Sequence, residues 1–207
     1  MTMDPTGAGT AGLVDRVKNI LLTPQAEWDK IAAEPADLNK LYLGYVLPLA
    51  ALAAVCGFIG MSVFGVSGFG ITYRTPLLAG LVGAVLQVGM GMAGVYIMAM
   101  ITNALAPNFG STPDPMQAHK LSAYGSTAGF LAGVFAIIPA LAALGIVGLY
   151  SLVLIFIGLP RLMKTPEDKR VGYFATIVIV DIVVMVVIYT VLGAVRSAAG
   201  MGVPGPF

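Results

Sequence analysis

The sequence predicts an all-α membrane protein: a polytopic helical bundle with five transmembrane helices, preceded by short amphipathic helices. Only 10% of its 207 residues are charged, whereas a soluble globular chain has about 25%. The charges are clustered, which leaves uncharged runs at 41–73, 75–113 and 121–160. Each run is longer than the roughly 20 apolar residues that cross a bilayer as a helix. An ordinary soluble domain is therefore excluded.

The composition also argues against several classes of function. The net charge is +1, so the chain lacks the excess of positive charge that is typical of nucleic-acid binding. One cysteine, Cys56, allows no internal disulfide, and one cysteine with one histidine cannot form the usual Cys/His zinc cluster. We therefore expect no nucleic-acid partner, no metal and no cofactor.

The N-terminal region predicts short helices outside the membrane core. Residues 1–10 have the composition of a disordered tail, and residues 11–40 predict cytosolic amphipathic helices. Helical spacing places one set of apolar side chains on a single face: Leu13, Val14, Val17, Ile20 and Leu21. Trp28 and Ile31 are suited to the headgroup level of a bilayer. Two interpretations stay open, contact with the membrane surface and packing against the ends of the spans.

A five-helix membrane domain is predicted over 41–195. Its first span covers 41–64, its second 76–106 and its last 172–195. The run 121–160 would be about 60 Å long as one helix, about twice the hydrocarbon thickness of a bilayer. We therefore expect this run to fold back near 139–145 as two spans. Residues 196–207, rich in Gly, Pro and Ala, predict a second disordered tail.

The distribution of Lys and Arg predicts the orientation of these spans. Five spans put the two termini on opposite sides of the membrane. All Lys and Arg residues except Arg74 and Arg196 fall on the side that holds the N-terminus and the loops 107–120 and 161–171. Because cytoplasmic loops carry an excess of Lys and Arg, we place the N-terminus in the cytoplasm and the C-terminal tail outside.

Asp181 is the acidic residue that falls deep inside a predicted span. An aspartate near the membrane midplane costs about 2.5–3.5 kcal/mol. Counting along the antiparallel spans brings Gln87, Tyr150 and Ser151 to a similar depth. We expect a protonated Asp181 to form a hydrogen bond with one of them and so to join two helices. A proton or ion relay and a tolerated lipid-exposed residue are the alternatives.

Small residues in the third span predict close helix packing. Gly125, Gly129 and Gly133 recur at every fourth position, which gives a smooth helix face. This face suits packing inside the bundle or a dimer interface. The methionines of the second span are interpreted as adaptable apolar filler rather than as ligands of a soft metal.

No pattern in the sequence predicts an enzyme. The segments 7–12 and 89–94 match the Gly-x-Gly-x-x-Gly dinucleotide fingerprint, but the first follows no strand and the second lies inside a predicted span. No Walker loop, nucleophile elbow or His-Glu-x-x-His helix is present. We therefore assign no catalytic residues and expect no enzymatic activity.

The order of the elements resembles the bacterial branch of the Yip1 domain family. The resemblance covers about 12–195, and the segments that carry it are, in chain order, LVDRVKNILLTP at 13–24, HKLSAYGST at 119–127, YSL at 150–152, GLP at 158–160 and TPEDK at 165–169. It implies a five-helix membrane domain with a cytosolic N-terminus. Eukaryotic members bind Rab GTPases, and they have an Asp-Leu-Tyr-Gly-Pro segment before the first span. This chain has Asp37-Leu38-Asn39-Lys40-Leu41 instead, so Rab binding is not transferred to it.

Two functions are compatible with these observations. The leading hypothesis is a non-enzymatic protein of the bacterial inner membrane, a scaffold that organises membrane components through its cytosolic face. Its expected partners are the bilayer and another membrane protein or a second copy of the chain. The alternative is a small transporter or channel that uses Asp181. A membrane-embedded lipid enzyme is a third hypothesis, for which no nucleophile and base are apparent.

Overall fold

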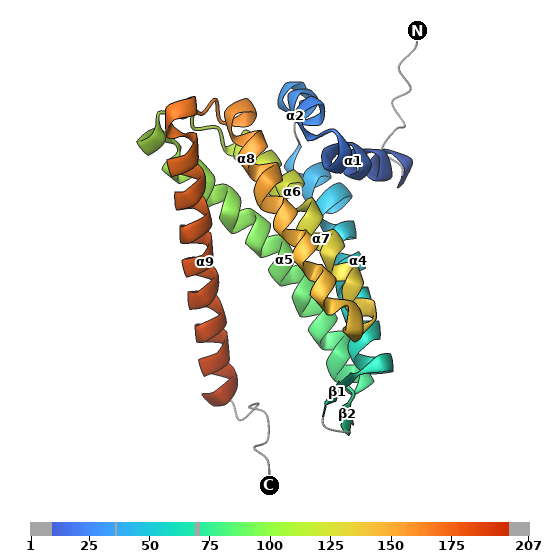
Figure 1. The fold of residues 1–207 in the computed structure, drawn as a ribbon. Helices are drawn as coiled ribbons and strands as arrows, with labels where there is room; N and C mark the ends of the chain where they lie inside the picture. The colour runs from blue at the N-terminus through green and yellow to red at the C-terminus, as the bar shows by residue number, and fades with distance from the viewer. Residues whose placement is uncertain (1–9, 36, 69–70, 199–207) are drawn as a thin grey trace.

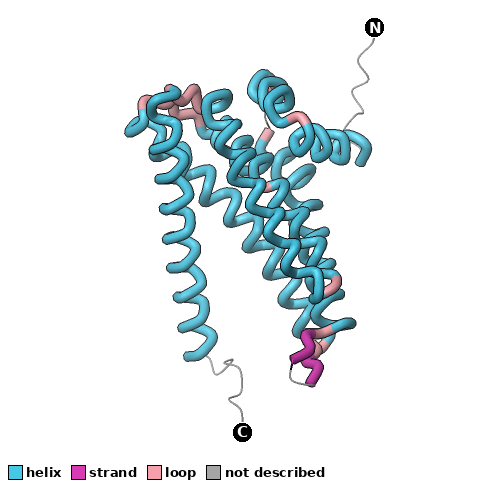
Figure 2. Tube along the Cα trace, viewed as in Figure 1, coloured by secondary structure: helices cyan, strands magenta, loops and turns pink. Residues whose placement is uncertain are grey.

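The computed structural model describes residues 10–35, 37–68 and 71–198, and it is an elongated helical bundle (Figures 1 and 2). The end that carries the first two helices is named the charged end, and the opposite end, which carries two short strands, is named the hairpin end. The predicted tails, 1–10 and 196–207, lie outside the described residues except at their inner edges. There, helix α1 begins at Thr10 and helix α9 continues to Ala198.

Two helices form the outer layer of the charged end. They are α1 (Thr10–Leu22) and α2 (Pro24–Ala33). Asp37 then starts the first long helical segment, because its carboxylate accepts hydrogen bonds from the backbone N–H groups of Asn39 and Lys40 at 2.9 and 3.3 Å. The segment contains α3 (Leu38–Leu41), the π-helical turn η1 (Tyr42–Val46), α4 (Leu47–Ile59) and the π-helical turn η2 (Gly60–Phe64).

The connection at the hairpin end contains the strands β1 (Val66–Gly68) and β2 (Ile71–Tyr73), which pair antiparallel. This hairpin is an addition to the all-α class expected from the sequence. Gly65 ends the preceding helix with a φ of 73°, a conformation that glycine adopts without strain. The next elements are α5 (Leu77–Leu105) and the 3-10 turn η3 (Ala106–Phe109).

The run predicted to fold back does so at Ile138, which is extended with φ −120° and ψ 110°. The outgoing arm consists of α6 (Pro115–Gly125), α7 (Thr127–Ala132) and the 3-10 segment η4 (Gly133–Ile137). The returning arm consists of the 3-10 segment η5 (Pro139–Leu149) and α8 (Tyr150–Leu162). The two arms pack side by side, η5 against α7 and η4, and α8 against α6 (Figure 1).

Within the described residues, four helical segments are long and apolar enough to cross a membrane. They are Leu38–Phe64, Leu77–Phe109, Pro139–Leu162 and Glu167–Ile188. The last of them belongs to α9 (Glu167–Ala198). The outgoing arm 115–137 is helical but is interrupted at Ser126, so neither of its parts has the length of a span. Four of the five predicted spans are therefore supported, and the fifth stays a prediction.

The best-packed region lies at the charged end, where α2 rests on α8 and α6. Trp28, Ile31, Leu121, Leu154 and Leu159 are all 0% exposed there. The side chains of Trp28 and Ile31 therefore pack against the ends of the long helices, because α6 and α8 cover them. On α1, Ile20 is buried, whereas Val14 and Leu22 are exposed. Contact of α1 with the membrane surface stays a prediction.

Gly158 allows the close approach of α2 to α8, and we expect its replacement to weaken the fold. A Cβ atom there would lie 2.5 Å from Leu121 Cδ1 and 2.9 Å from Trp28 Cε2. Because both neighbours are fully buried, we expect Gly158→Ala to lower the free energy of unfolding by about 1–3 kcal/mol. The measurement is thermal unfolding in detergent micelles. The control is Gly89→Ala, where nothing lies within 4 Å; equal melting temperatures for the two variants would contradict the prediction.

Candidate functional site

Arg16 joins α1 to α2 and α6 at the charged end. Its Nη1 atom contacts Glu27 Oε1 and its Nη2 atom contacts Glu34 Oε1, both at 2.6 Å. The Glu27 side chain is only 3% exposed, so it needs a charged partner. The Arg16 guanidinium also lies 5.6 Å from the centre of the Tyr124 ring, a cation–π contact with α6.

Lys120 and Gln117 of α6 bind the C-terminus of α2. Lys120 Nζ donates hydrogen bonds to the backbone oxygens of Ile31 and Glu34, at 2.8 and 2.5 Å. Gln117 Nε2 donates to the Ala32 oxygen at 3.2 Å. The last carbonyl groups of a helix have no partner within it, and a positive charge there also interacts favourably with the helix dipole. These bonds therefore fix both the position and the direction of α2.

His119 connects α6 with the first two long helical segments. Its Nδ1 atom lies 2.9 Å from the Tyr42 hydroxyl oxygen. The rings of Tyr42 and Tyr96 pack on it with centroid distances of 5.7 and 5.0 Å. The side chain is 5% exposed, and burial lowers the pKa of His119 because it disfavours the charged imidazolium.

A cavity of about 650 Å³ lies farther along the bundle, between α4, α5, α7, α8 and α9. Its wall is mostly apolar and includes Met90, Met98 and Met185. Asp181 from α9, Gln87 from α5 and Ser151 from α8 also line it. The volume is in the range of pockets that bind small molecules, about 300–1,000 Å³. The wall combines a few polar groups with apolar surface, as such pockets do.

The structure therefore brings together three of the four polar residues grouped by sequence. Asp181 Oδ1 is buried and has no hydrogen-bond partner among the described residues, so this atom does not form the expected bond. Ser151 Oγ instead accepts a hydrogen bond from the Gly129 N–H at 2.8 Å. Tyr150 does not line the cavity, because its hydroxyl donates to the Leu21 oxygen at 3.1 Å. It connects α8 to α1.

The three spaced glycines face neighbouring helices within the same chain. A Cβ atom at Gly125 would lie 2.6 Å from Ile155 Cγ1, and one at Gly129 would lie 3.4 Å from Ser151 Oγ. A Cβ atom at Gly133 would lie 2.7 Å from Ala53 Cβ. Gly125 and Gly129 thus allow α8 to approach, and Gly133 allows α4 to approach. In this chain the glycines serve packing inside the bundle.

The residues that hold the charged end together are not apparent from the sequence pattern. Arg16 and Lys120 count there only as positive charges of the cytosolic side. The spacing of Glu27 and Glu34 places both on one face of a helix, which is a signal for a shared positive partner. Nothing in the sequence identifies Arg16 as that partner. No set of three or more His, Cys, Asp or Glu side chains that could hold a metal occurs in 10–35, 37–68 and 71–198.

We expect the stability of the protein to decrease as the pH falls below about 6.5, the ordinary pKa of histidine. The folded state has the lower pKa at His119, so the unfolded chain binds the proton first as the pH falls. His119→Gln should reduce this pH dependence, since His119 is the chain's one histidine. The measurement is the free energy of unfolding between pH 7.5 and 5.5. Identical slopes for both proteins would rule out this role of His119.

Comparison with known proteins places the chain in a family. The family model described as the Yip1 domain matches residues 18–189. Two relatives are both named Inner membrane protein YohC, one from Escherichia coli strain K12 and one from Escherichia coli O6:H1 strain CFT073. Each is 26% identical over 170 residues, which is 80% of this chain and 87% of the relative. No solved structure matches the chain. Because the family model covers well over half of the sequence and includes all four apolar helical segments, this integral membrane protein belongs to the Yip1 domain family.

Proposed function

We propose that this chain is a non-enzymatic protein of the bacterial inner membrane that organises other membrane components through its charged end. The observation that carries the proposal is the docking of α1 and α2 onto α6 by Arg16 and Lys120. A surface that is already ordered loses little conformational entropy when a partner binds. The docked helices therefore suit a binding platform. The partner is a membrane protein of another kind or a second copy of this chain.

Exposed charges on the platform support this proposal. Asp15 and Lys18 on α1 are exposed, as is Lys30 on α2. Lys30 is 63% exposed although it contacts Glu27. Arg16 and Lys120, in contrast, are largely buried in the contacts that hold the helices. The exposed set is therefore available for electrostatic recognition of a partner.

Orientation and span number are part of the same proposal. The charged end lies in the cytoplasm, in accord with the Lys and Arg distribution, and the name of the relatives supports the inner membrane as the location. Residues 121–137 of the outgoing arm supply the fifth crossing, because this part of the arm runs beside η5 and α8 (Figure 1). The C-terminus is then outside.

A small transporter or channel is the second candidate. It is favoured by the cavity and by Asp181, whose buried Oδ1 lacks a partner among the described residues. An ionisable residue at this depth is a common feature of proton and ion pathways. The scaffold is preferred, because the polar contacts of the chain concentrate at the charged end.

We expect a photo-crosslinking amino acid in place of Lys18 to capture a specific membrane-protein partner in native membranes. Charge reversal nearby, by Lys30→Glu, should lower the yield about tenfold, which corresponds to about 1.4 kcal/mol. Deletion of α1 and α2 is avoided because it removes Trp28 and Ile31 from the core. The control is the same probe in place of Tyr73, which is exposed at the hairpin end. Equal capture from both positions, or no effect of Lys30→Glu, would contradict the proposal.

We also expect the two ends of the bundle to lie on opposite sides of the membrane. In a Cys56→Ala background, a membrane-impermeant thiol reagent should label Tyr73→Cys in intact cells whose outer membrane has been opened. Lys18→Cys should react only after the inner membrane is opened as well. Alkaline phosphatase fused after Phe207 should be active, because five spans place that end outside. An inactive fusion would support four spans instead.

A further inference from the structure

We propose that the cavity beside Asp181 binds a membrane lipid with a small uncharged head that carries a hydroxyl group, as in a diacylglycerol. The head would lie at Asp181, Gln87 and Ser151, and an acyl chain would occupy the apolar part. This inference goes beyond the scaffold role and does not depend on it. It rests on the position of the cavity, its shape, its polar groups and the absence of positive side chains from its wall among the described residues.

The position of the cavity favours an occupant that arrives from the bilayer. Its lining residues come from all four apolar helical segments, with Ala53, Leu86, Ile155 and Met185 as one example from each. The cavity is therefore at membrane depth rather than at the charged end. The molecules available at that depth are lipids, whose chains are the most abundant component of a bilayer core.

Three polar groups give the cavity a defined point of recognition. Asp181 Oδ1 is buried and without a hydrogen-bond partner among the described residues. A buried polar atom without a partner is unfavourable, so a bound hydrogen-bonding group would stabilise it. The Ser151 Oγ atom accepts one hydrogen bond from Gly129, which leaves its hydrogen as a donor, and Gln87 offers both donors and an acceptor. A hydroxyl group both donates and accepts, so it matches all three.

The charge of the wall selects against other lipid heads. No Lys, Arg or His lines the cavity among the described residues. The phosphate of a phospholipid would therefore be buried without a cation and close to an acidic side chain, which is costly. A cationic amine could pair with Asp181, but both charges would then have to leave water. The uncharged hydroxyl avoids these costs.

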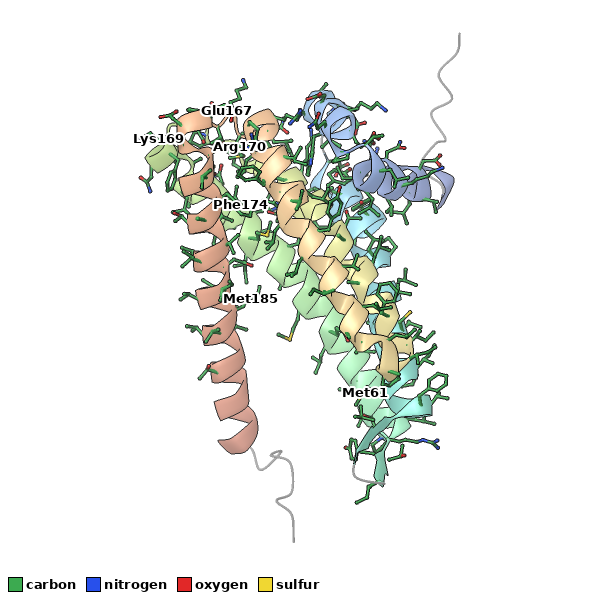
Figure 3. The ribbon with its side chains drawn as sticks, in the orientation of Figure 1. Met61, Glu167, Lys169, Arg170, Phe174 and Met185 are labelled. Carbon is green, nitrogen blue, oxygen red and sulfur yellow. The ribbon has the colours of Figure 1, made fainter. Side chains whose placement is uncertain are left out.

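The apolar wall has the shape and adaptability that an acyl chain requires. Glycines remove side chains from it, and a Cβ atom at Gly83 would meet nothing within 4 Å. Met90, Met98 and Met185 supply flexible, polarizable contacts. Met185 reaches from α9 toward α5, where its Cε atom would lie 3.0 Å from a Cβ atom at Gly94 (Figure 3). This part of the cavity can adjust to chains of different lengths.

The test uses the full chain in nanodiscs of phosphatidylethanolamine and phosphatidylglycerol that contain a trace of photoreactive diacylglycerol. We expect saturable labelling of peptides around Met90 and Met185. Unlabelled diacylglycerol should compete, whereas added phosphatidylglycerol and a long-chain amine should not. This comparison uses the unaltered protein, so it does not depend on how variants fold.

Variants inside and outside the cavity wall show where the photoreactive lipid binds. Gly83→Leu fills the cavity and should lower labelling about tenfold, while Gly89→Leu, on the same helix but outside the cavity wall, should leave it unchanged. Asp181→Leu should lower labelling by a similar factor, and Asp181→Asn, which keeps hydrogen-bonding groups, by less.

Four results would overturn the proposal. The first is equal competition by phosphatidylglycerol or by the amine, and the second is labelling that neither Gly83→Leu nor Asp181→Leu lowers. The third is a crosslink between two protomers at α9 in place of a crosslink to lipid. The fourth is proton flux in liposomes that Asp181→Asn abolishes, with no saturable lipid binding. The last result would assign the cavity to transport.

Discussion

The burial of α2 against α6 and α8 is the contact on which the rest of the charged end depends. Trp28 is fully buried against Gly158 and Leu121. Lys120 holds the last carbonyl groups of α2, and Arg16 neutralises the buried carboxylate of Glu27. Removal of one partner from such an arrangement leaves a buried charge or carbonyl group unpaired, which costs more than the contact itself contributes. The N-terminal helices are therefore an integral part of the bundle.

The requirement that backbone groups be paired inside a membrane explains the irregular outgoing arm. Near the interruption at Ser126, the Gly129 N–H is bound by Ser151 Oγ from the neighbouring helix. The Phe130 N–H keeps its ordinary helical partner, the Ser126 oxygen four residues before it. The absence of side chains at Gly125 and Gly129 lets the two arms approach closely enough for this pairing. The Ser151 side chain thus both pairs a backbone group of the outgoing arm and contributes a polar group to the cavity wall.

Hydropathy and charge predicted the parts of the fold that depend on the bilayer. The apolar runs identified the long helices, and the length of 121–160 predicted a return near 139–145, which the structure places at the adjacent Ile138. Contacts between distant segments could not be predicted in this way, since Lys120 and Glu34 are 86 positions apart. Counting residues along the antiparallel spans placed Asp181, Gln87 and Ser151 at a similar depth. It could not predict the direction in which each side chain points around its helix axis. Tyr150 therefore appeared in the same group, although packing turns it toward Leu21.

The attachment of α9 links the charged end to the cavity. Near its start, Tyr173 is fully buried, and its ring stacks on the Phe109 ring with a centroid distance of 5.1 Å. Its hydroxyl donates a hydrogen bond to the backbone oxygen of Thr102. Arg170 contacts the ring and backbone of Phe156. Farther along, Ile179, Ile182 and Val183 are exposed, as suits a lipid-facing helix. Asp181 and Met185, farther along the same helix, form one wall of the cavity. The packing of Tyr173 and Arg170 at the start of α9 therefore fixes the helix that carries this wall.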